Sequence, residues 1–157
     1  VCNGCQMISQ LRDLIPGATS WPDFIRNQSE QFEARLVMVE IMKSPSILFK
    51  DMAGSKIPVV VANAEGRVSY KPTDLMTNAA MRYIDNSGVS TEHYPLNPNG
   101  SINGLTGLTN DDGRITIMMP HPERVFLRKQ FSYLPSQWNN EYSPWMKIFL
   151  NAQTWLN

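Results

Sequence analysis

Two cysteines and two histidines are the residues of this sequence best suited to covalent or acid–base chemistry. Cys2 and Cys5 open the chain, and an apolar series follows at spacings typical of one helix face: Met7, Ile8, Leu11, Leu14 and Ile15. Pro16-Gly17 is expected to end that helix. Cys2 would then lie just ahead of a helix N-terminus, where the helix dipole and free N–H groups stabilise a thiolate. Gly4 would let the backbone turn sharply, as in a nucleophile elbow.

The spacing of the two cysteines leaves three interpretations open. They could be half-buried structural residues. They could form a redox pair, because Cys2 and Cys5 make a C-x-x-C motif at a helix start. Cys2 could also be a nucleophile, with Cys5 incidental, and that interpretation needs a general base elsewhere in the chain.

His121 is the candidate base. It follows Ile115–Met119, an almost continuous apolar segment that predicts a buried strand, and prolines flank it on both sides. The imidazole would therefore be held just past the end of a strand, where sites in α/β sheets collect. Glu123, two residues later, is near enough to orient the ring. His93 lies in a loop-like segment and is expected to be a plain surface residue.

These residues resemble the signature motifs of a known family. Val1–Gln6 resembles the C-x-G-x-Q nucleophile motif of class I (triad) glutamine amidotransferases, and Pro120–Glu123 resembles their His-x-Glu pair. Longer strings at 26–35, 94–104 and 118–126 are similar to the C-terminal glutaminase domain of phosphoribosylformylglycinamidine synthases, the large enzymes of purine biosynthesis. The similarity extends over essentially the whole chain, so residues 1–157 are expected to form one portion of a single glutaminase domain.

The resemblance implies a fold and a reaction. The fold would be α/β, an open mixed sheet flanked by helices of the flavodoxin-like type. Cys2 would attack the carboxamide of glutamine to form a thioester, His121 would transfer the protons and Glu123 would orient His121. The N–H of Asn3 could donate to the developing oxyanion. The ammonia would pass to a synthase part of the same polypeptide.

The resemblance also suggests substrate contacts. Gln6 matches the last residue of the nucleophile motif, whose side chain contacts glutamine in the family. Asn27, Ser29 and Gln31 resemble a family segment near the glutamine pocket. At residues 62–67 relatives typically carry Ser-His-Gly-Glu-Gly-Arg, whereas this chain reads Ala-Asn-Ala-Glu-Gly-Arg, so the contacts around that strand end are in doubt.

The chain opens one residue before Cys2, whereas the family places several strands and part of the oxyanion hole upstream. The sequence is therefore expected to be the C-terminal portion of its domain, weakly active or inactive alone, and prone to self-association through exposed sheet edges. No cofactor is expected in these residues; ATP and magnesium would belong to the synthase part.

Composition limits the other classes. The 14 basic and 14 acidic residues balance, which argues against nucleic acid or an anionic membrane as a partner, and no apolar run is long enough to span a bilayer. A cytoplasmic location is expected. Two cysteines and two distant histidines lack the spacing of a zinc site. Two alternatives remain: an inert piece that acts only as an interaction surface, and, less favoured, a thiol–disulfide oxidoreductase, since Val1 and Asn3-Gly4 replace the Trp and Pro of thioredoxin-like sites.

Periodicity predicts the remaining elements. Strands are expected at 32–42, 57–62, 66–70, 81–84, 105–108 and 114–119, with a hairpin turn at 110–113. Helices are expected at 73–81 and, capped by Ser143-Pro144, at 145–156. On the last helix Trp145, Ile148, Phe149, Ala152 and Leu156 should share the buried face. Such a mixture of buried strands and helices indicates an α/β sheet architecture.

Overall fold

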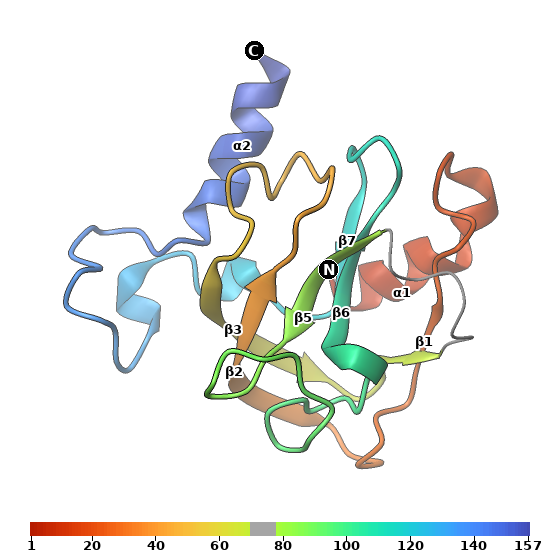
Figure 1. The fold of residues 1–157 in the computed structure, drawn as a ribbon, viewed down its shortest axis with the longest axis horizontal. Helices are drawn as coiled ribbons and strands as arrows, with labels where there is room; N and C mark the ends of the chain where they lie inside the picture. The colour runs from red at the N-terminus through yellow and green to blue at the C-terminus, as the bar shows by residue number, and fades with distance from the viewer. Residues whose placement is uncertain (70–77) are drawn as a thin grey trace.

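A computed structural model describes residues 1–69 and 78–157 of the chain. Its centre is a five-stranded sheet in the order β3-β2-β5-β6-β7 (Figure 1), formed by β2 (Glu33–Ile41), β3 (Lys56–Asn63), β5 (Ala79–Tyr83), β6 (Leu105–Thr109) and β7 (Thr116–Met118). A separate ribbon pairs β1 (Asp23–Ile25) with β4 (Arg67–Ser69). The helices are α1 (Asn3–Gln10) and α2 (Met146–Leu156). The architecture is therefore α/β, as expected. Every strand pair among the described residues is antiparallel, so the described sheet is not the mixed sheet that the resemblance implied.

The longest strands form where the apolar pattern is densest. β2 and β3 pair over eight positions, from Glu33 opposite Asn63 to Glu40 opposite Lys56. The turn between β6 and β7 is closed by Gly113, whose N–H donates to the carbonyl of Asn110 and whose φ of 75° suits glycine. These two strands and this hairpin confirm the expectations from sequence.

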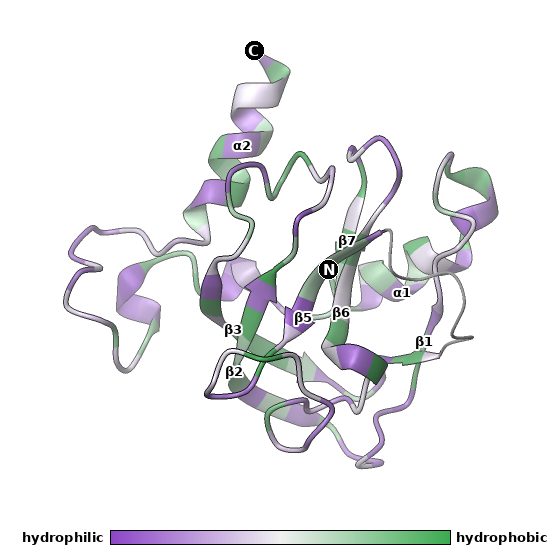
Figure 2. Cartoon of the chain, in the orientation of Figure 1, coloured by the Kyte–Doolittle hydropathy of each residue, from purple (hydrophilic) through white to green (hydrophobic). Residues whose placement is uncertain are grey.

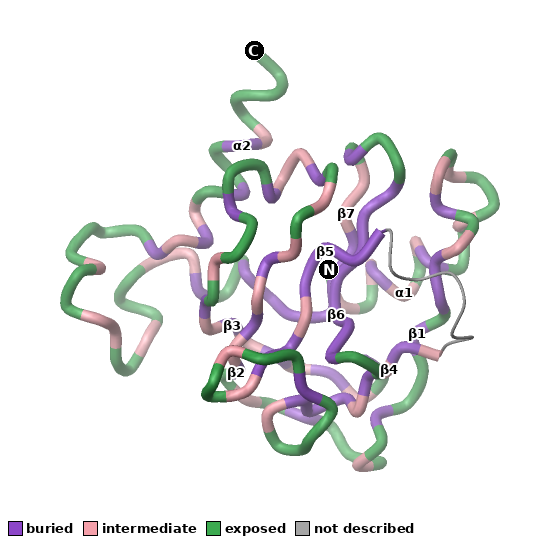
Figure 3. Tube along the Cα trace, viewed as in Figure 1, coloured by how far each residue is buried: buried purple, intermediate pink, exposed green. Residues whose placement is uncertain are grey.

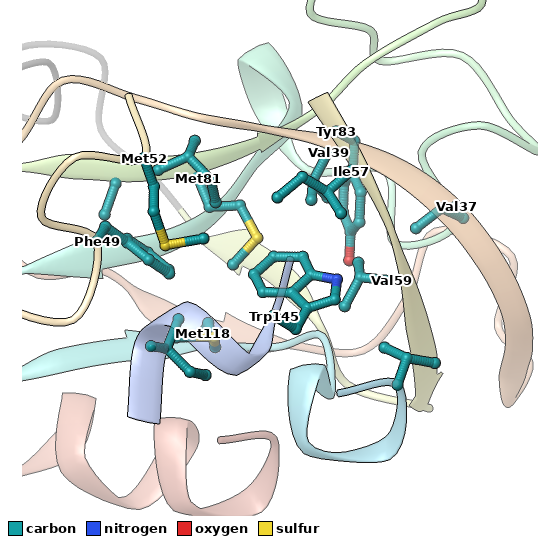
Figure 4. Close-up of a cluster of buried hydrophobic side chains, with 14 of the residues drawn as sticks. Val37, Val39, Phe49, Met52, Ile57, Val59, Met81, Tyr83, Met118 and Trp145 are labelled. Atoms are coloured by element: carbon teal, nitrogen blue, oxygen red, sulfur yellow. The ribbon is translucent and has the colours of Figure 1, made fainter. Parts of the chain in front are cut away.

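The buried residues gather along the strands of the sheet (Figure 3), and their apolar side chains form two clusters. At the end of β7 the side chain of Met118 joins one cluster, whereas those of Ile117 and the following Met119 join the other, so the two clusters lie on opposite faces there. In the first cluster the fully buried Trp145, at the start of α2, lies beside Met81 and Val59 (Figure 4). The second cluster joins α1 to the sheet through Cys5, which is completely buried. The end of β7 is thus fixed from both sides.

The predicted apolar face of the first helix is only partly correct, because Ile8 and Ile15 pack against the second cluster but the other three residues do not. The α-helix ends at Gln10, and a 3₁₀ turn (Arg12–Leu14) follows. The side chains of Met7, Leu11 and Leu14 are 55%, 43% and 79% exposed. The buried positions of α1 are Cys5 and Ser9, one turn apart, because this face points at the sheet. The apolar pattern found only Ile8 of this contact, because its two fully buried residues are a cysteine and a serine.

Other predicted elements need correction. Residues 73–77 of the predicted helix at 73–81 lie outside the described residues, but Ala79–Tyr83 is a strand that pairs with both β2 and β6. The strand β1 was not predicted. Hydrophobic and polar segments alternate along α2, as Figure 2 shows, yet Phe149 and Leu156 are exposed and Asn151 is buried. The Asn151 amide donates to the carbonyls of Leu48 and Lys50, so the helix is held there by hydrogen bonds.

Candidate active site

Cys2 occupies a strained turn immediately before α1. Its φ of 51° and ψ of −115° lie outside the regions that side chains favour, which is typical of residues held for function. The strain falls on the cysteine and not on Gly4, which lies inside the helix and has open space beside it. The Cys2 N–H donates to the carbonyl of Met118 at 2.9 Å, so the turn is attached to the end of β7. The thiol is half-buried and contacts the carbonyl of Ala62 at 3.8 Å, at the end of β3.

His121 lies at the same strand ends. It follows β7, and its N–H donates to the carbonyl of Val60 on β3 at 2.7 Å. Its Nδ1 is 2.6 Å from Oε1 of Glu123, the hydrogen bond expected from sequence. The other ring nitrogen, Nε2, is buried and has no hydrogen-bond partner among the described residues. A carboxylate on Nδ1 fixes the ring so that Nε2 is the nitrogen available for proton transfer.

The backbone connects the nucleophile and the base through β3. The thiol of Cys2 contacts Ala62 and the N–H of His121 bonds Val60, two positions earlier on the same strand. Met118, which accepts from the Cys2 N–H, is three residues before His121. The structure therefore brings Cys2, His121 and Glu123 to one end of the sheet. Thiol and imidazole are not hydrogen-bonded to each other, a looseness common in active sites without ligand.

Gln6 and Asn3 lie beside the cysteine on α1. The N–H of Gln6 donates to the carbonyl of Cys2, so its side chain is one helical turn beyond the thiol. Its Nε2 donates to the backbone carbonyl of Glu65 at 2.7 Å and to the Glu65 carboxylate at 3.3 Å. Asn3 is the first residue of α1, where a backbone N–H has no acceptor within the helix. Such a donor is free to serve an oxyanion, and that role stays a prediction.

Asn27 lies in a buried hydrogen-bond network. Its Nδ2 donates to the carbonyls of Gln31 and Asn63, and its Oδ1 accepts from the Gly66 N–H and from Asn99 Nδ2. All four hydrogen-bonding positions of the amide are used. Asn27 therefore holds the loop after β3 in place, and its predicted contact with substrate is left without a free polar atom.

Ser29 and Gln31 line a different cavity. This space of about 550 Å³ is bounded by residues 28–31 and by the loop at 92–100, including His93 and Tyr94. Neither Cys2 nor His121 lines it. The five predicted substrate residues are thus divided: Asn3 and Gln6 lie beside the thiol, Asn27 lies in the buried hydrogen-bond network, and Ser29 and Gln31 lie at the separate cavity. Their contacts with a substrate stay predictions.

Cys5 differs from Cys2 in its surroundings. Both are free thiols, but Cys5 is completely buried in the second apolar cluster. Burial raises the pKa of the Cys5 thiol far above its ordinary value, because the thiolate would lose its hydration. A redox pair needs accessible sulfurs of thiolate character, so the geometry favours Cys2 as a single nucleophile.

Sequence reasoning missed Glu65 as part of the site. Its signals were its place three residues after the end of an apolar strand and its match to the family string at residues 62–67, but nothing in its spacing links it to Gln6, 59 positions away. Among the described residues, no group of three or more His, Cys, Asp or Glu side chains could hold a metal ion. No helix within the described ranges is long and apolar enough to cross a membrane.

Comparison with known proteins agrees with this geometry. Residues 1–156 match the family model of the CobB/CobQ-like glutamine amidotransferase domain. The chain belongs to this family. Among solved structures it is similar to that of PurLQS from Thermotoga maritima, with a TM-score of 0.69 and 22% sequence identity. The match covers 99% of this chain but 59% of the other, so this amidotransferase domain spans well under two thirds of the length of the chain it resembles. The α/β class and the resemblance to glutamine amidotransferases inferred from the sequence are both confirmed.

Proposed function

We propose that this chain hydrolyses glutamine to glutamate and ammonia through a thioester on Cys2. The observation that carries the proposal is the meeting of a strained cysteine and a carboxylate-oriented histidine at one end of β3. Family membership supports glutamine as the substrate.

Each residue has one role in this reaction. His121 Nε2 accepts the Cys2 proton, and the thiolate attacks the carboxamide carbon. The same nitrogen returns a proton to the departing ammonia. Water then hydrolyses the glutamyl thioester and restores the thiol. The hydrogen bond between Glu123 and Nδ1 stabilises the imidazolium present between these steps. The Asn3 N–H lies in the first helical turn, where it can donate to the tetrahedral oxyanion.

We further propose that the ammonia serves an ATP- and magnesium-dependent ligase that makes phosphoribosylformylglycinamidine in purine biosynthesis. Sequence motifs support it, as does similarity to PurLQS. The ATP and magnesium would be held by the synthase part. None of the described residues forms a carboxylate cluster that would fit a magnesium ion here.

Affinity labelling tests the glutaminase proposal. In the complete synthase, a diazo ketone analogue of L-glutamine should form a stoichiometric adduct on Cys2, detected by mass spectrometry of tryptic peptides. Glutamine should block it, and His121→Ala should abolish it. The buried Cys5 is the internal control and should stay unmodified. Equal labelling of Cys2 and Cys5, or an adduct that glutamine does not block, would refute the proposal.

A further inference from the structure

A basic cavity lies between α2 and residues 42–53, which follow β2. Its volume is about 580 Å³, a size typical of small-molecule sites. The Asn151 amide donates to the carbonyls of Leu48 and Lys50, so α2 and this segment are held together at the cavity (Figure 1). None of the three triad residues lines it, so the proposed glutaminase reaction leaves it without a role.

The lining of the basic cavity carries unpaired positive charge. Lys43, Lys50 and Lys147 are exposed, and their ammonium groups have no ion-pair or hydrogen-bond partner among the described residues. Asp51 also lines the cavity but is not within ion-pair distance of any of them, so three lysines and one aspartate give a net charge of +2. An anion between the ammonium groups would relieve their mutual repulsion.

The other walls suit a ligand larger than a simple ion. Trp155 lines the cavity with its side chain 52% exposed, while the guanidinium of Arg114 lies 5.7 Å from the centroid of its ring. Lys147 and Trp155 are eight residues apart on α2, which is about 12 Å along the helix axis. Ser44, another lining residue, has a buried hydroxyl without a partner among the described residues. A ligand that reaches both ends is therefore elongated, with negative charge at one end and a flat group at the other.

A nucleoside phosphate has this chemistry. Its phosphate oxygens accept hydrogen bonds from ammonium groups, and lysine is a common phosphate ligand. Its base has a flat face that stacks on an aromatic side chain whichever base it is. Inorganic phosphate would occupy only the lysine end of the cavity, and an acidic protein segment would supply the charge without requiring the tryptophan.

We propose that the basic cavity binds a nucleoside phosphate, with the phosphate groups between the three lysines and the base against Trp155. The inference is independent of the proposed glutaminase function, because none of the lining residues belongs to the site around Cys2.

Lysine footprinting in the complete synthase tests the proposal. An acetylating reagent modifies accessible lysines, and mass spectrometry of peptides gives the rate at each one. ADP at about ten times its Kd should slow the acetylation of the three cavity lysines by about 10-fold, as mass action requires. Lys56 is exposed but lies outside the cavity, so its rate should not change. Adenosine should protect none of the lysines, and pyrophosphate should protect them only at a higher concentration than ADP.

Two variants separate direct binding from an indirect effect of ADP bound elsewhere in the synthase. Trp155→Ala should raise the ADP concentration that half-protects Lys43 by about 10- to 100-fold, the effect of losing one stacked base, and leave that of pyrophosphate unchanged. Lys147→Gln should raise both concentrations by about 10-fold, because it removes a charged donor to phosphate. Tyr133→Ala removes another exposed ring, one outside the cavity, and should behave as wild type.

Three results would overturn the inference. ADP could fail to protect the cavity lysines, or it could protect them equally in the wild type and in both variants, which would place the bound nucleotide elsewhere. The cavity lysines could also resist acetylation without any ligand, which would show that a segment of the synthase part covers the cavity.

Discussion

At the residue scale, the site depends on one carboxylate that orients one ring. Glu123 is 44% exposed, whereas the histidine that it bonds is almost fully buried. The Glu123 carboxylate also lies 3.7 Å from Nε of Arg124. The imidazole is thus buried in the sheet while its partner stays partly hydrated. Such a partner can stabilise an imidazolium during turnover.

Glu123→Gln should therefore separate orientation from charge. Glutamine can still accept a hydrogen bond from Nδ1, but it cannot stabilise the imidazolium. We expect labelling of Cys2 by the L-glutamine analogue to slow by about 10- to 100-fold, within the range of general acid–base effects. The rates are measured by mass spectrometry, with Glu141→Gln as the matched control. An unchanged rate would show that Glu123 has no part in activating the cysteine.

Cys5 gives a prediction about stability and pH. Its folded-state pKa is raised because burial removes the hydration of the thiolate. An unfolded cysteine loses its proton near pH 8.5. Above that pH the unfolded state binds fewer protons than the folded state, so the free energy of unfolding falls by about 1.4 kcal/mol per pH unit. Below pH 8.5 both states are protonated and the contribution is fully present.

Denaturant unfolding between pH 7 and 10 measures this slope. Cys5→Ala should remove it, although the variant starts from a lower stability because it leaves a small cavity. Ser9→Ala is the control, since Ser9 is the other buried residue of α1 and its side chain does not ionise between pH 7 and 10. The buried Tyr83, whose pKa burial also raises, loses its proton in the unfolded state near pH 10 and so affects only the top of the range. A slope that survives in Cys5→Ala would contradict the assignment.

At the scale of elements, the sequence predicts those strands and turns whose signals lie within a few neighbouring residues. β2, β3 and the turn at 110–113 were predictable because alternating apolar residues and turn residues act over a few positions. Ala79–Met81 was placed in a helix, because nothing nearby reveals that β2 and β6 pair with it on both sides. Likewise the bond between Asn27 and Asn99 joins residues 72 positions apart. The proximity of Cys2, His121 and Glu123 could be predicted because a strand end and two prolines mark His121 locally, whereas only the fold brings Glu65 to Gln6.

The buried hydrogen-bond network around Asn27 makes the stability of the protein sensitive to substitution of Gly66. A Cβ there would lie 2.5 Å from Asn99 Nδ2 and 2.6 Å from Asn63 Oδ1, and both side chains are buried and bonded to each other. Gly66→Ala should therefore destabilise the protein by about 1–3 kcal/mol. Gly4→Ala is the contrasting variant, because it meets no atom within 4 Å and lies in a helix. It should stabilise by up to about 1 kcal/mol. Equal changes in the free energy of unfolding for the two variants, measured with denaturant, would show that the hydrogen-bond network is not rigid.

At the scale of the whole molecule, the proposed function assigns glutamine hydrolysis to this chain and ammonia use to a synthase part. The residues that carry the first task lie together at one end of the sheet, on α1, β3 and the loop after β7. If the division holds, a synthase supplied with free ammonia has no need of them.

Cys2→Ala in the complete synthase should therefore abolish glutamine-dependent formation of phosphoribosylformylglycinamidine while ammonia-dependent formation persists. The smaller side chain removes the nucleophile and leaves the Cys2 N–H bond to Met118 in place, so the fold should survive. The measurement is product formation with glutamine or with an ammonium salt as the nitrogen source, and Cys5→Ala is the matched cysteine control, expected to retain both activities. Equal loss of both activities in a folded Cys2→Ala protein would show that this chain does more than release ammonia, and the proposed division of labour would have to be abandoned.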